Sequence, residues 1–212
     1  MIRILIVDDH ELVRRGLKTV FSGRVDMEVA AEANSGEAAI ALLRRETFDV
    51  VLVDLALPDM SGIDVLSRCK AIRPELAVLI VSGYPEDQYA INVLKSGASG
   101  FVAKDESPGN MVAAVLAAAQ GRRYVSPRVA DKLAQSLTGR AADEPAHTRL
   151  SEREFQIFYR LAAGESVSAI ARELFLSVKT VSTYRIRLLE KLHMRSNAEL
   201  MRYAIENRLV DS

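Results

Sequence analysis

The feature that most constrains the fold of this 212-residue chain is the alternation, in its first half, of short apolar runs with amphipathic segments. Apolar runs rich in Val, Ile and Leu are typical of strands buried on both faces, and a 3.6-residue apolar period is typical of helices. Five strand–helix pairs in succession predict a doubly wound α/β domain with a parallel five-stranded sheet. The expected strands are Ile2–Val7, Glu28–Ala33, Val50–Leu55, Val78–Val81 and Gly100–Val102, and the expected helices are Leu12–Phe21, Gly36–Leu43, Gly62–Ile72, Asp87–Ser96 and Pro108–Gln120.

The pattern changes after residue 121. A short helical piece at roughly 127–137 precedes "TGRAADEPAHT", whose Gly, Ala, Pro and charged residues are typical of a linker. From Leu150 onward four short amphipathic segments predict a small all-α domain, and two of them begin with a Ser–x–x–Glu capping box. We therefore predict one domain at 1–121 and a second, smaller one at 148–212, with a linker at 122–147.

Charge and composition suggest two different tasks in a reducing compartment. The formal net charge is zero, but residues 1–121 carry 12 Lys and Arg against 17 Asp and Glu, whereas residues 122–212 carry 16 against 11. A basic half suggests a polyanionic partner. The single cysteine, Cys69, makes the cytoplasm the expected compartment, and we expect no membrane segment because no run of about 18 apolar residues occurs.

Acidic residues follow two of the predicted strands. Asp54 ends the apolar run "VVLVD", and a carboxylate there is unfavourable unless it is paired. Because ligands collect at the carboxyl ends of the strands in a doubly wound sheet, we expect Asp54 to lie close to Asp8 and Asp9. A hard cation such as Mg²⁺ would relieve their repulsion and leave Asp54 free to attack a phosphoryl group. Ser82, at the end of the fourth strand, and Lys104, just after the fifth, would then contact the phosphoryl oxygens.

Each of these residues alone has an ordinary explanation. An aspartate at a strand end is more often a solvated turn residue, and a lysine after a strand is usually a surface residue. Ser82 could be no more than a helix cap. The combination, in this order along the strands, is what favours a phosphoryl-transfer site.

Residues 1–121 resemble the receiver domain of two-component response regulators in "VDDH", "VDLALPDMSG", "VSG" and "GASGFVAKD". The resemblance implies a flavodoxin- or CheY-like fold in which Asp54 is the phospho-acceptor. It also implies a sensor histidine kinase or a phosphotransfer domain as the partner. Mg²⁺ would be held by Asp8, Asp9 and Asp54 together with the carbonyl group of Ala56.

The same resemblance assigns roles to the residues after the later strands. Ser82 is expected to be the switch hydroxyl, and Lys104 to contact the phosphoryl group. Phe101 matches the aromatic residue that changes rotamer on phosphorylation. Position alone, rather than the resemblance, leads to a further expectation. Ala56 has no side chain to orient a water molecule, and Tyr84, two residues after Ser82, is expected to cover the approach of water to the acyl phosphate.

The last four helices resemble the LuxR/FixJ-type helix-turn-helix in "LSEREFQIFYRLAAG", "SAIARELFLSVKTVSTYRIRLLEKL" and "SNAEL", and "DDHELVRRGL" is typical of the NarL/FixJ branch. The segment "KTVSTYRIRLLEKL" is similar to that of GacA/UvrY-like or BvgA/EvgA-like members. The resemblance implies binding to double-stranded promoter DNA, as a homodimer.

Helical periodicity supports this reading of the third helix. Val181, Leu188 and Leu192 form an apolar stripe, and the opposite face is polar and basic, as suits a helix that enters a major groove. A solvated basic face is the simpler alternative. Ile186 occupies a position where some relatives have lysine, so their base preference cannot be copied. The expected DNA-contacting residues are Lys179, Thr180, Ser182, Thr183, Ile186, Arg187 and Lys191.

We therefore predict a cytoplasmic DNA-binding response regulator that is not an enzyme, apart from slow self-dephosphorylation. One alternative is a Mg²⁺-dependent aspartyl phosphatase or transferase, which normally needs an acid or base two residues after the nucleophile, where this chain has Ala56. A second is a phosphorylation-independent DNA-binding protein with a degenerate receiver. The complete acidic set argues against it.

Overall fold

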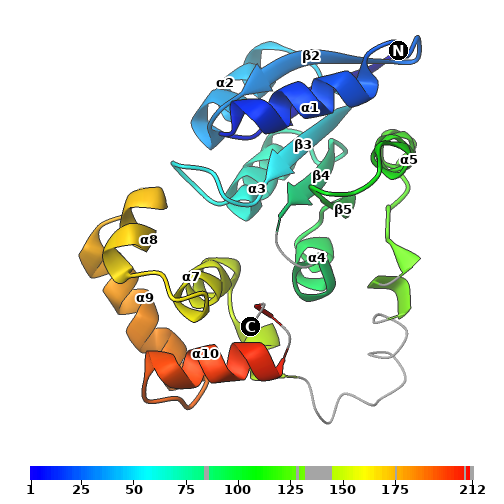
Figure 1. Ribbon diagram of the computed structural model, residues 1–212. Coiled ribbons are helices and arrows are strands. Elements are labelled where there is room, and N and C mark those ends of the chain that lie inside the picture. The colour runs from blue at the N-terminus through cyan, green and yellow to red at the C-terminus, as the bar shows by residue number, and fades with distance from the viewer. Residues whose placement is uncertain (84–85, 128, 132–144, 175, 208, 211–212) are drawn as a thin grey trace. The chain divides into compact units, whose positions relative to one another are not determined.

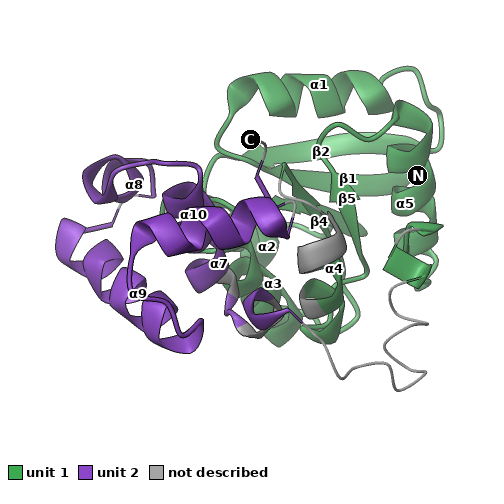
Figure 2. Cartoon of the chain, turned by 60° about the horizontal axis from the view of Figure 1, so that its bottom comes forward, with its two compact units in different colours: residues 1–140 green, residues 141–212 purple. Residues whose placement is uncertain are grey.

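The computed structural model describes residues 1–83, 86–127, 129–131, 145–174, 176–207 and 209–210. The chain divides into two compact units, residues 1–140 and residues 141–212, called unit 1 and unit 2 below (Figure 2). Most of the predicted linker at 122–147, and most of the helical piece expected at roughly 127–137, falls outside the described residues.

A parallel sheet forms the centre of unit 1, and its strands are β1 (Ile2–Val7), β2 (Met27–Ala33), β3 (Val50–Asp54), β4 (Ala77–Ser82) and β5 (Gly100–Ala103). They lie in the order β2-β1-β3-β4-β5 (Figure 1). The predicted α/β class and five-stranded parallel sheet are therefore confirmed. The whole of β3 and β4 is buried, as their continuous Val, Ile and Leu content predicts.

Helices cover both faces of the sheet: α1 (Glu11–Phe21), α2 (Gly36–Arg45), α3 (Gly62–Ile72), α4 (Glu86–Lys95) and α5 (Pro108–Ala119). The connection from β1 to β2 runs across the sheet in one direction, and the next three connections run in the other. Because such crossovers are right-handed, α1 lies on one face and α2, α3 and α4 lie on the other. The α5 helix shares the face of α1, where both pack on alternate residues of the strands.

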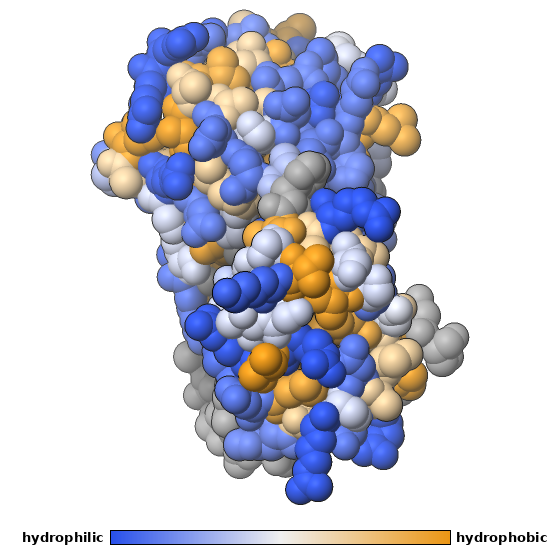
Figure 3. All heavy atoms as spheres, turned by 90° about the vertical axis from the view of Figure 1, so that its left-hand side faces the viewer, coloured by the Kyte–Doolittle hydropathy of each residue, from blue (hydrophilic) through white to orange (hydrophobic). Residues whose placement is uncertain are grey.

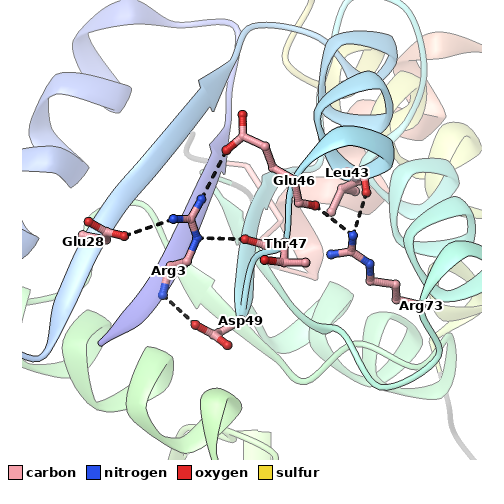
Figure 4. Close-up of polar contacts among 7 residues, drawn as sticks. All are labelled: Arg3, Glu28, Leu43, Glu46, Thr47, Asp49 and Arg73. Carbon is pink, nitrogen blue, oxygen red and sulfur yellow. Dashed lines mark hydrogen bonds and ion pairs between the residues drawn. The ribbon is translucent and has the colours of Figure 1, made fainter.

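Arg3 ties neighbouring elements together at the amino-terminal edge of the sheet (Figure 4). Its backbone N–H donates to Asp49 Oδ2 (2.7 Å), and its Nε donates to the carbonyl oxygen of Thr47 (2.9 Å). Its guanidinium also pairs with Glu28 (3.5 Å) and Glu46 (3.2 Å). These contacts join β1 to β2 and to the segment that enters β3. Because they are largely exposed, the ion pairs themselves add little stability.

Unit 2 contains a short 3₁₀ helix, η2 (Ala146–Arg149), and the helices α7 (Glu152–Ala162), α8 (Val167–Glu173), α9 (Val178–Lys191) and α10 (Asn197–Glu206). The predicted small all-α domain is thus confirmed. A serine side chain accepts a backbone N–H in the first turn of each of these four α-helices, which satisfies a group that the helix leaves unpaired. These serines are Ser151, Ser166, Ser177 and Ser196.

An aromatic cluster closes unit 2 around η2. The rings of His147, Phe155, Phe158 and Tyr203 meet edge to face, with centroids 5.4 to 6.2 Å apart. The hydroxyl of Tyr203 accepts the backbone N–H of His147 (3.2 Å) and lies 2.9 Å from its Nδ1. The segment before α7 is therefore anchored to α10.

The surface carries apolar residues in scattered positions. On the face shown in Figure 3, hydrophobic residues form separate groups among hydrophilic ones. Examples of large apolar residues on the surface are Leu12, Val25 and Ile186, with 83%, 94% and 54% of their surface accessible to solvent. None of the helices in the described part of the chain has the length and apolar character needed to span a membrane.

Candidate functional site

The carboxyl ends of β1 and β3 bring three aspartates together. The two strands are neighbours, with Val7 opposite Val53, so Asp8 follows β1 beside Asp54, the last residue of β3. Asp8 and Asp54 are buried, and the side chain of Asp9 is partly exposed. In the sheet, β2 lies on one side of β1 and β3 lies on the other, so the strand order reverses at β1. Ligands bind at the carboxyl ends of the strands beside such a reversal.

Lys104 binds two of these carboxylates. Its Nζ lies 2.8 Å from Asp54 Oδ2 and 2.8 Å from Asp8 Oδ2. Its backbone N–H donates to the carbonyl oxygen of Ser82 (2.8 Å), which fixes the turn after β5 against the end of β4. One cation thus faces two buried carboxylates.

The site opposes the ionisation of Asp54. Burial raises the pKa of Asp54, Lys104 lowers it, and the nearby charge of Asp8 raises it, with a net result of about 6. Burial lowers the pKa of Lys104, but its two carboxylate partners outweigh burial, so that pKa is raised. At neutral pH the site therefore holds an ammonium group and an ionised but destabilised Asp54 carboxylate.

The donor set at this edge fits a hard divalent cation. Ligand atoms of Asp8, Asp9, His10 and Asp54 lie within 4.8 Å of one another. Asp9 Oδ1 is hidden from solvent and receives no hydrogen bond, although it lies 2.7 Å from His10 Nδ1. A buried carboxylate oxygen without a donor suits a metal ligand, and carboxylates are the ligands that Mg²⁺ takes. The side chain of His10 is 66% exposed and contacts the rim of this cluster.

The loop between β3 and α3 passes very close to the end of β3. Ala56 and Ser61 form an isolated bridge, and the N–H of Gly62 donates to the carbonyl oxygen of Leu55 (2.8 Å). A side chain on Gly62 would press against the backbone of Asp54 and would come within 2.8 Å of the Leu55 Cα atom. Only glycine fits there, so its presence lets the loop run against the backbone at the end of β3.

The predicted switch residues lie in the core of unit 1. Ser82, at the end of β4, is fully buried, and Phe101 in β5 is 1% exposed. The side chain of Val102 packs with α1 and α5 on one face of the sheet. Because side chains alternate along a strand, the side chain of Phe101 points to the other face. Tyr84, which we expect to shield the acyl phosphate, lies outside the described residues.

Asp59, in the loop that follows Asp54, makes contacts that the sequence analysis missed. Its two carboxylate oxygens accept the backbone N–H groups of Gly36 (2.9 Å) and Glu37 (2.7 Å), at the start of α2. In the sequence "LPDMSG", an aspartate after a proline is simply a turn residue. Its partners lie 22 and 23 residues away, so no local signal points to them.

The α9 helix has the two faces that its sequence predicts. Val181, Leu188 and Leu192 are buried, which confirms the apolar stripe. On the opposite face, Ile186 is 54% exposed. The other predicted DNA-contacting residues are exposed (Lys179, Thr183, Arg187 and Lys191) or partly exposed (Thr180 and Ser182).

Two cations of α9 have partners within unit 2. Lys191 Nζ lies 2.7 Å from Glu154 Oε2, and Arg185 Nε donates to Asn197 Oδ1 (2.7 Å). Glu154 also accepts the backbone N–H of Ser151 (2.8 Å) as part of the capping box of α7. The carboxyl end of α9 is thereby tied to the start of α7.

Comparisons with known proteins agree with both halves of this description. A family model described as "Response regulator receiver domain" matches residues 4–116, and one described as "Bacterial regulatory proteins, luxR family" matches residues 148–204. The response regulator GacA of Pseudomonas aeruginosa is 36% identical over 213 residues, which span 100% of this chain and 99% of GacA.

Two further matches span nearly the whole chain. The response regulator UvrY of Escherichia coli K12 is 32% identical over 212 residues, which span 100% of this chain and 97% of UvrY. A solved structure of RcsB from Salmonella enterica serovar Typhimurium, bound to promoter rprA in the presence of phosphomimetic BeF₃⁻, is 26% identical. That match covers 95% of this chain and 97% of that chain, with a TM-score of 0.67.

Proposed function

Because the chain belongs to the response regulators that join a receiver domain to a LuxR-type DNA-binding domain, we propose that phosphorylation of Asp54 controls its binding to promoter DNA. Members of this family are transcription regulators rather than enzymes, which removes the phosphatase or transferase alternative. The observation that carries the proposal is the contact of Lys104 with both Asp54 and Asp8 at the carboxyl edge of the sheet.

The phosphoryl donor in this proposal is a sensor histidine kinase or a phosphotransfer domain. A carboxylate oxygen of Asp54 attacks the phosphorus atom, the bond from phosphorus to the donor histidine nitrogen breaks, and an acyl phosphate forms. A pKa of about 6 leaves most of Asp54 ionised at pH 7.5, as a nucleophile requires. Lys104 stabilises the added charge by donating to a phosphoryl oxygen, and Ser82 donates to another. Phe101 would change rotamer in response.

Asp8, Asp9 and Asp54, with the carbonyl group of Ala56, would hold Mg²⁺ at this site. When bound, Mg²⁺ neutralises charge on the phosphoryl oxygens. The buried Asp9 Oδ1 atom that receives no hydrogen bond supports this assignment. Since Mg²⁺ keeps several waters and uses few protein ligands, we expect a dissociation constant on the order of millimolar.

In unit 2, α9 is proposed to enter the major groove of the promoter. Lys179 and Arg187 would bind phosphates, and Ile186 would contact a thymine methyl group. The remaining proposed contacts are Thr180, Ser182, Thr183 and Lys191. The binding form is proposed to be a homodimer on two half-sites about one helical turn apart. The RcsB structure with promoter DNA supports this assignment for the fold.

We further propose that the receiver spans 1–121 and the DNA-binding domain 148–212, with 122–147 as a linker. The proposed compartment is the cytoplasm, because promoter DNA and the phosphoryl donor meet the protein there.

Acetyl phosphate labelling tests the phospho-acceptor directly. In the presence of Mg²⁺, the wild-type chain should shift on a phosphate-affinity gel, and Asp54→Ala should not. Asp26→Ala is a matched control, because it removes an aspartate that pairs with Arg24 in the turn before β2. Stoichiometric labelling of Asp54→Ala would show that the acceptor is elsewhere.

A further inference from the structure

Asp59 is a candidate for a role that goes beyond the ligands proposed above. It lies in the β3–α3 loop, five residues after Asp54 and three after Ala56, and its carboxylate binds the first turn of α2 through two hydrogen bonds. The backbone N–H groups at the start of a helix are otherwise unpaired and carry partial positive charge. The contact therefore joins the loop that carries the proposed metal ligands to a helix on the same face of the sheet.

The turn that leads into α2 also contacts Asp8, on the other side of the acidic cluster. The carbonyl oxygen of Ala33, at the end of β2, accepts the backbone N–H of Asp8 (3.1 Å). The turn from Ala33 to Glu37 thus holds Asp8 at one end and Asp59 at the other. The two loops that supply the proposed Mg²⁺ ligands are braced by a single turn of the chain.

Packing makes this brace stiff. Gly36 lies directly under Met60, and a Cβ atom added to Gly36 would come within 2.6 Å of the Met60 sulfur. The far end of α2 is fixed as well, because Arg73 donates to the carbonyl oxygens of Leu43 (3.1 Å) and Glu46 (2.8 Å), as Figure 4 shows. Since Arg73 follows α3 and Asp59 precedes it, α2 and α3 are clipped together at both ends, and they pack against each other between them.

From these contacts we infer that Asp59 is a positioning residue, which holds the β3–α3 loop so that the Ala56 carbonyl group and Asp54 meet Asp8 and Asp9 in a geometry that binds Mg²⁺. This inference rests on the proposed metal site. It assigns to Asp59 no contact with the metal or with the phosphoryl group. Outer partners that orient metal ligands typically change metal affinity by about tenfold or more when they are lost.

The test is a Mg²⁺ titration of the full chain, followed by the backbone amide signals of residues 54–62 in NMR spectra. Asp59→Ala removes both hydrogen bonds, and Asp59→Asn keeps one oxygen acceptor and the shape of the side chain. We expect Mg²⁺ affinity to fall about tenfold in Asp59→Ala and by a smaller factor in Asp59→Asn. Asp9→Ala, which removes a proposed ligand, is the reference for complete loss.

Ser35→Ala is the matched control. The Ser35 hydroxyl caps the same helix by accepting the N–H of Ala38 (3.2 Å), so its loss weakens the start of α2 without touching the loop. Unfolding in urea, measured for each variant, reports the stability lost. If Asp59 positions the loop, Ser35→Ala keeps the wild-type Mg²⁺ affinity at a comparable loss of stability.

Unchanged Mg²⁺ affinity in both Asp59 variants would overturn the inference, and so would an equal loss in Ser35→Ala. Acetyl phosphate labelling of the wild-type chain, done in parallel, separates this inference from the phospho-acceptor proposal. A chain that binds Mg²⁺ with the expected dependence on Asp59 but takes up no phosphate contradicts only that proposal. A wild-type chain that binds no Mg²⁺ contradicts this inference and the proposed metal site, while the labelling result still decides the phospho-acceptor proposal.

Discussion

At the scale of single residues, the buried pair of Asp54 and Lys104 makes the receiver less stable than its packing would allow. The folded-state pKa of Asp54, about 6, lies above the usual 3.8, so ionisation of this carboxyl group opposes folding. The stability that the protonated group contributes is complete below about pH 4 and is lost as the pH rises through 6.

We therefore expect Asp54→Asn to stabilise unit 1 at pH 7.5, by about 2–3 kcal/mol in the absence of Mg²⁺. Asparagine preserves the shape of the side chain, and Lys104 keeps its contact with Asp8. Urea unfolding at pH 7.5 and at pH 4.5 measures the difference, which should fall by about two thirds at the lower pH. A variant no more stable than the wild type at pH 7.5 would contradict the assigned cost of burying Asp54.

At the scale of elements, the carboxyl end of α9 depends on the start of α7. Burial raises the pKa of Glu154, but hydrogen bonds from Lys191 and Ser151 outweigh burial, so the pKa lies below its usual 4.5. Stability from this carboxylate is present above the usual pKa and is lost as the pH falls through the lower, folded-state value.

Glu154→Gln should therefore lower the free energy of unfolding of unit 2 by about 1–2 kcal/mol at pH 7, since it weakens the cap and leaves Lys191 without its anionic partner. The deficit should shrink below pH 4.5. Glu199→Gln is the matched control, because Glu199 holds the same position in α10 but its carboxylate accepts the backbone N–H of Arg195 (2.8 Å). Equal losses in the two variants would argue against the link between α7 and α9.

The elements were largely predictable from the sequence, and the contacts between them were not. Every strand and helix predicted within residues 1–121 is present, with ends that move by at most two residues, because buried strands and amphipathic helices have strong local signals. The meeting of Asp8, Asp54 and Lys104 followed from the order of the strands. The roles of Asp59 and His147 depend on distant backbone and ring partners, which periodicity does not encode.

At the scale of the whole molecule, an acidic receiver is joined to a basic DNA-binding unit. We expect affinity for promoter DNA to fall steeply with salt, with a log–log slope of about −0.9 for each phosphate neutralised. Lys179→Ala or Arg187→Ala should reduce the slope by about 1 per half-site. Arg185→Ala and Lys191→Ala should have smaller effects, because both cations already have partners within unit 2.

The opposite charges lead to a hypothesis: if the receiver shields the basic helices before activation, phosphorylation would shift an existing equilibrium towards the open form. The domain proposed at 148–212, made as a fragment of residues 145–212 so that it keeps His147, should then bind promoter DNA without phosphorylation, while the full chain needs phosphorylated Asp54 for tight binding. Footprinting of both proteins, each treated with acetyl phosphate or left untreated, measures this. Equal affinity of the fragment and the unphosphorylated full chain would rule out shielding.

The anchoring of His147 on Tyr203 bears on how such regulators can be recombined. A chimera that fuses a foreign sensor module directly to α7 would delete the His147 ring from the aromatic cluster. It would also remove the contacts of His147 with the Tyr203 hydroxyl. An exchange should therefore be made upstream of Ala146, within the linker proposed at 122–147, so that His147 moves with the DNA-binding unit. An exchange made there carries the whole aromatic cluster with the transplanted unit. We then expect the unit to fold in the same way whatever the length of the connector before it.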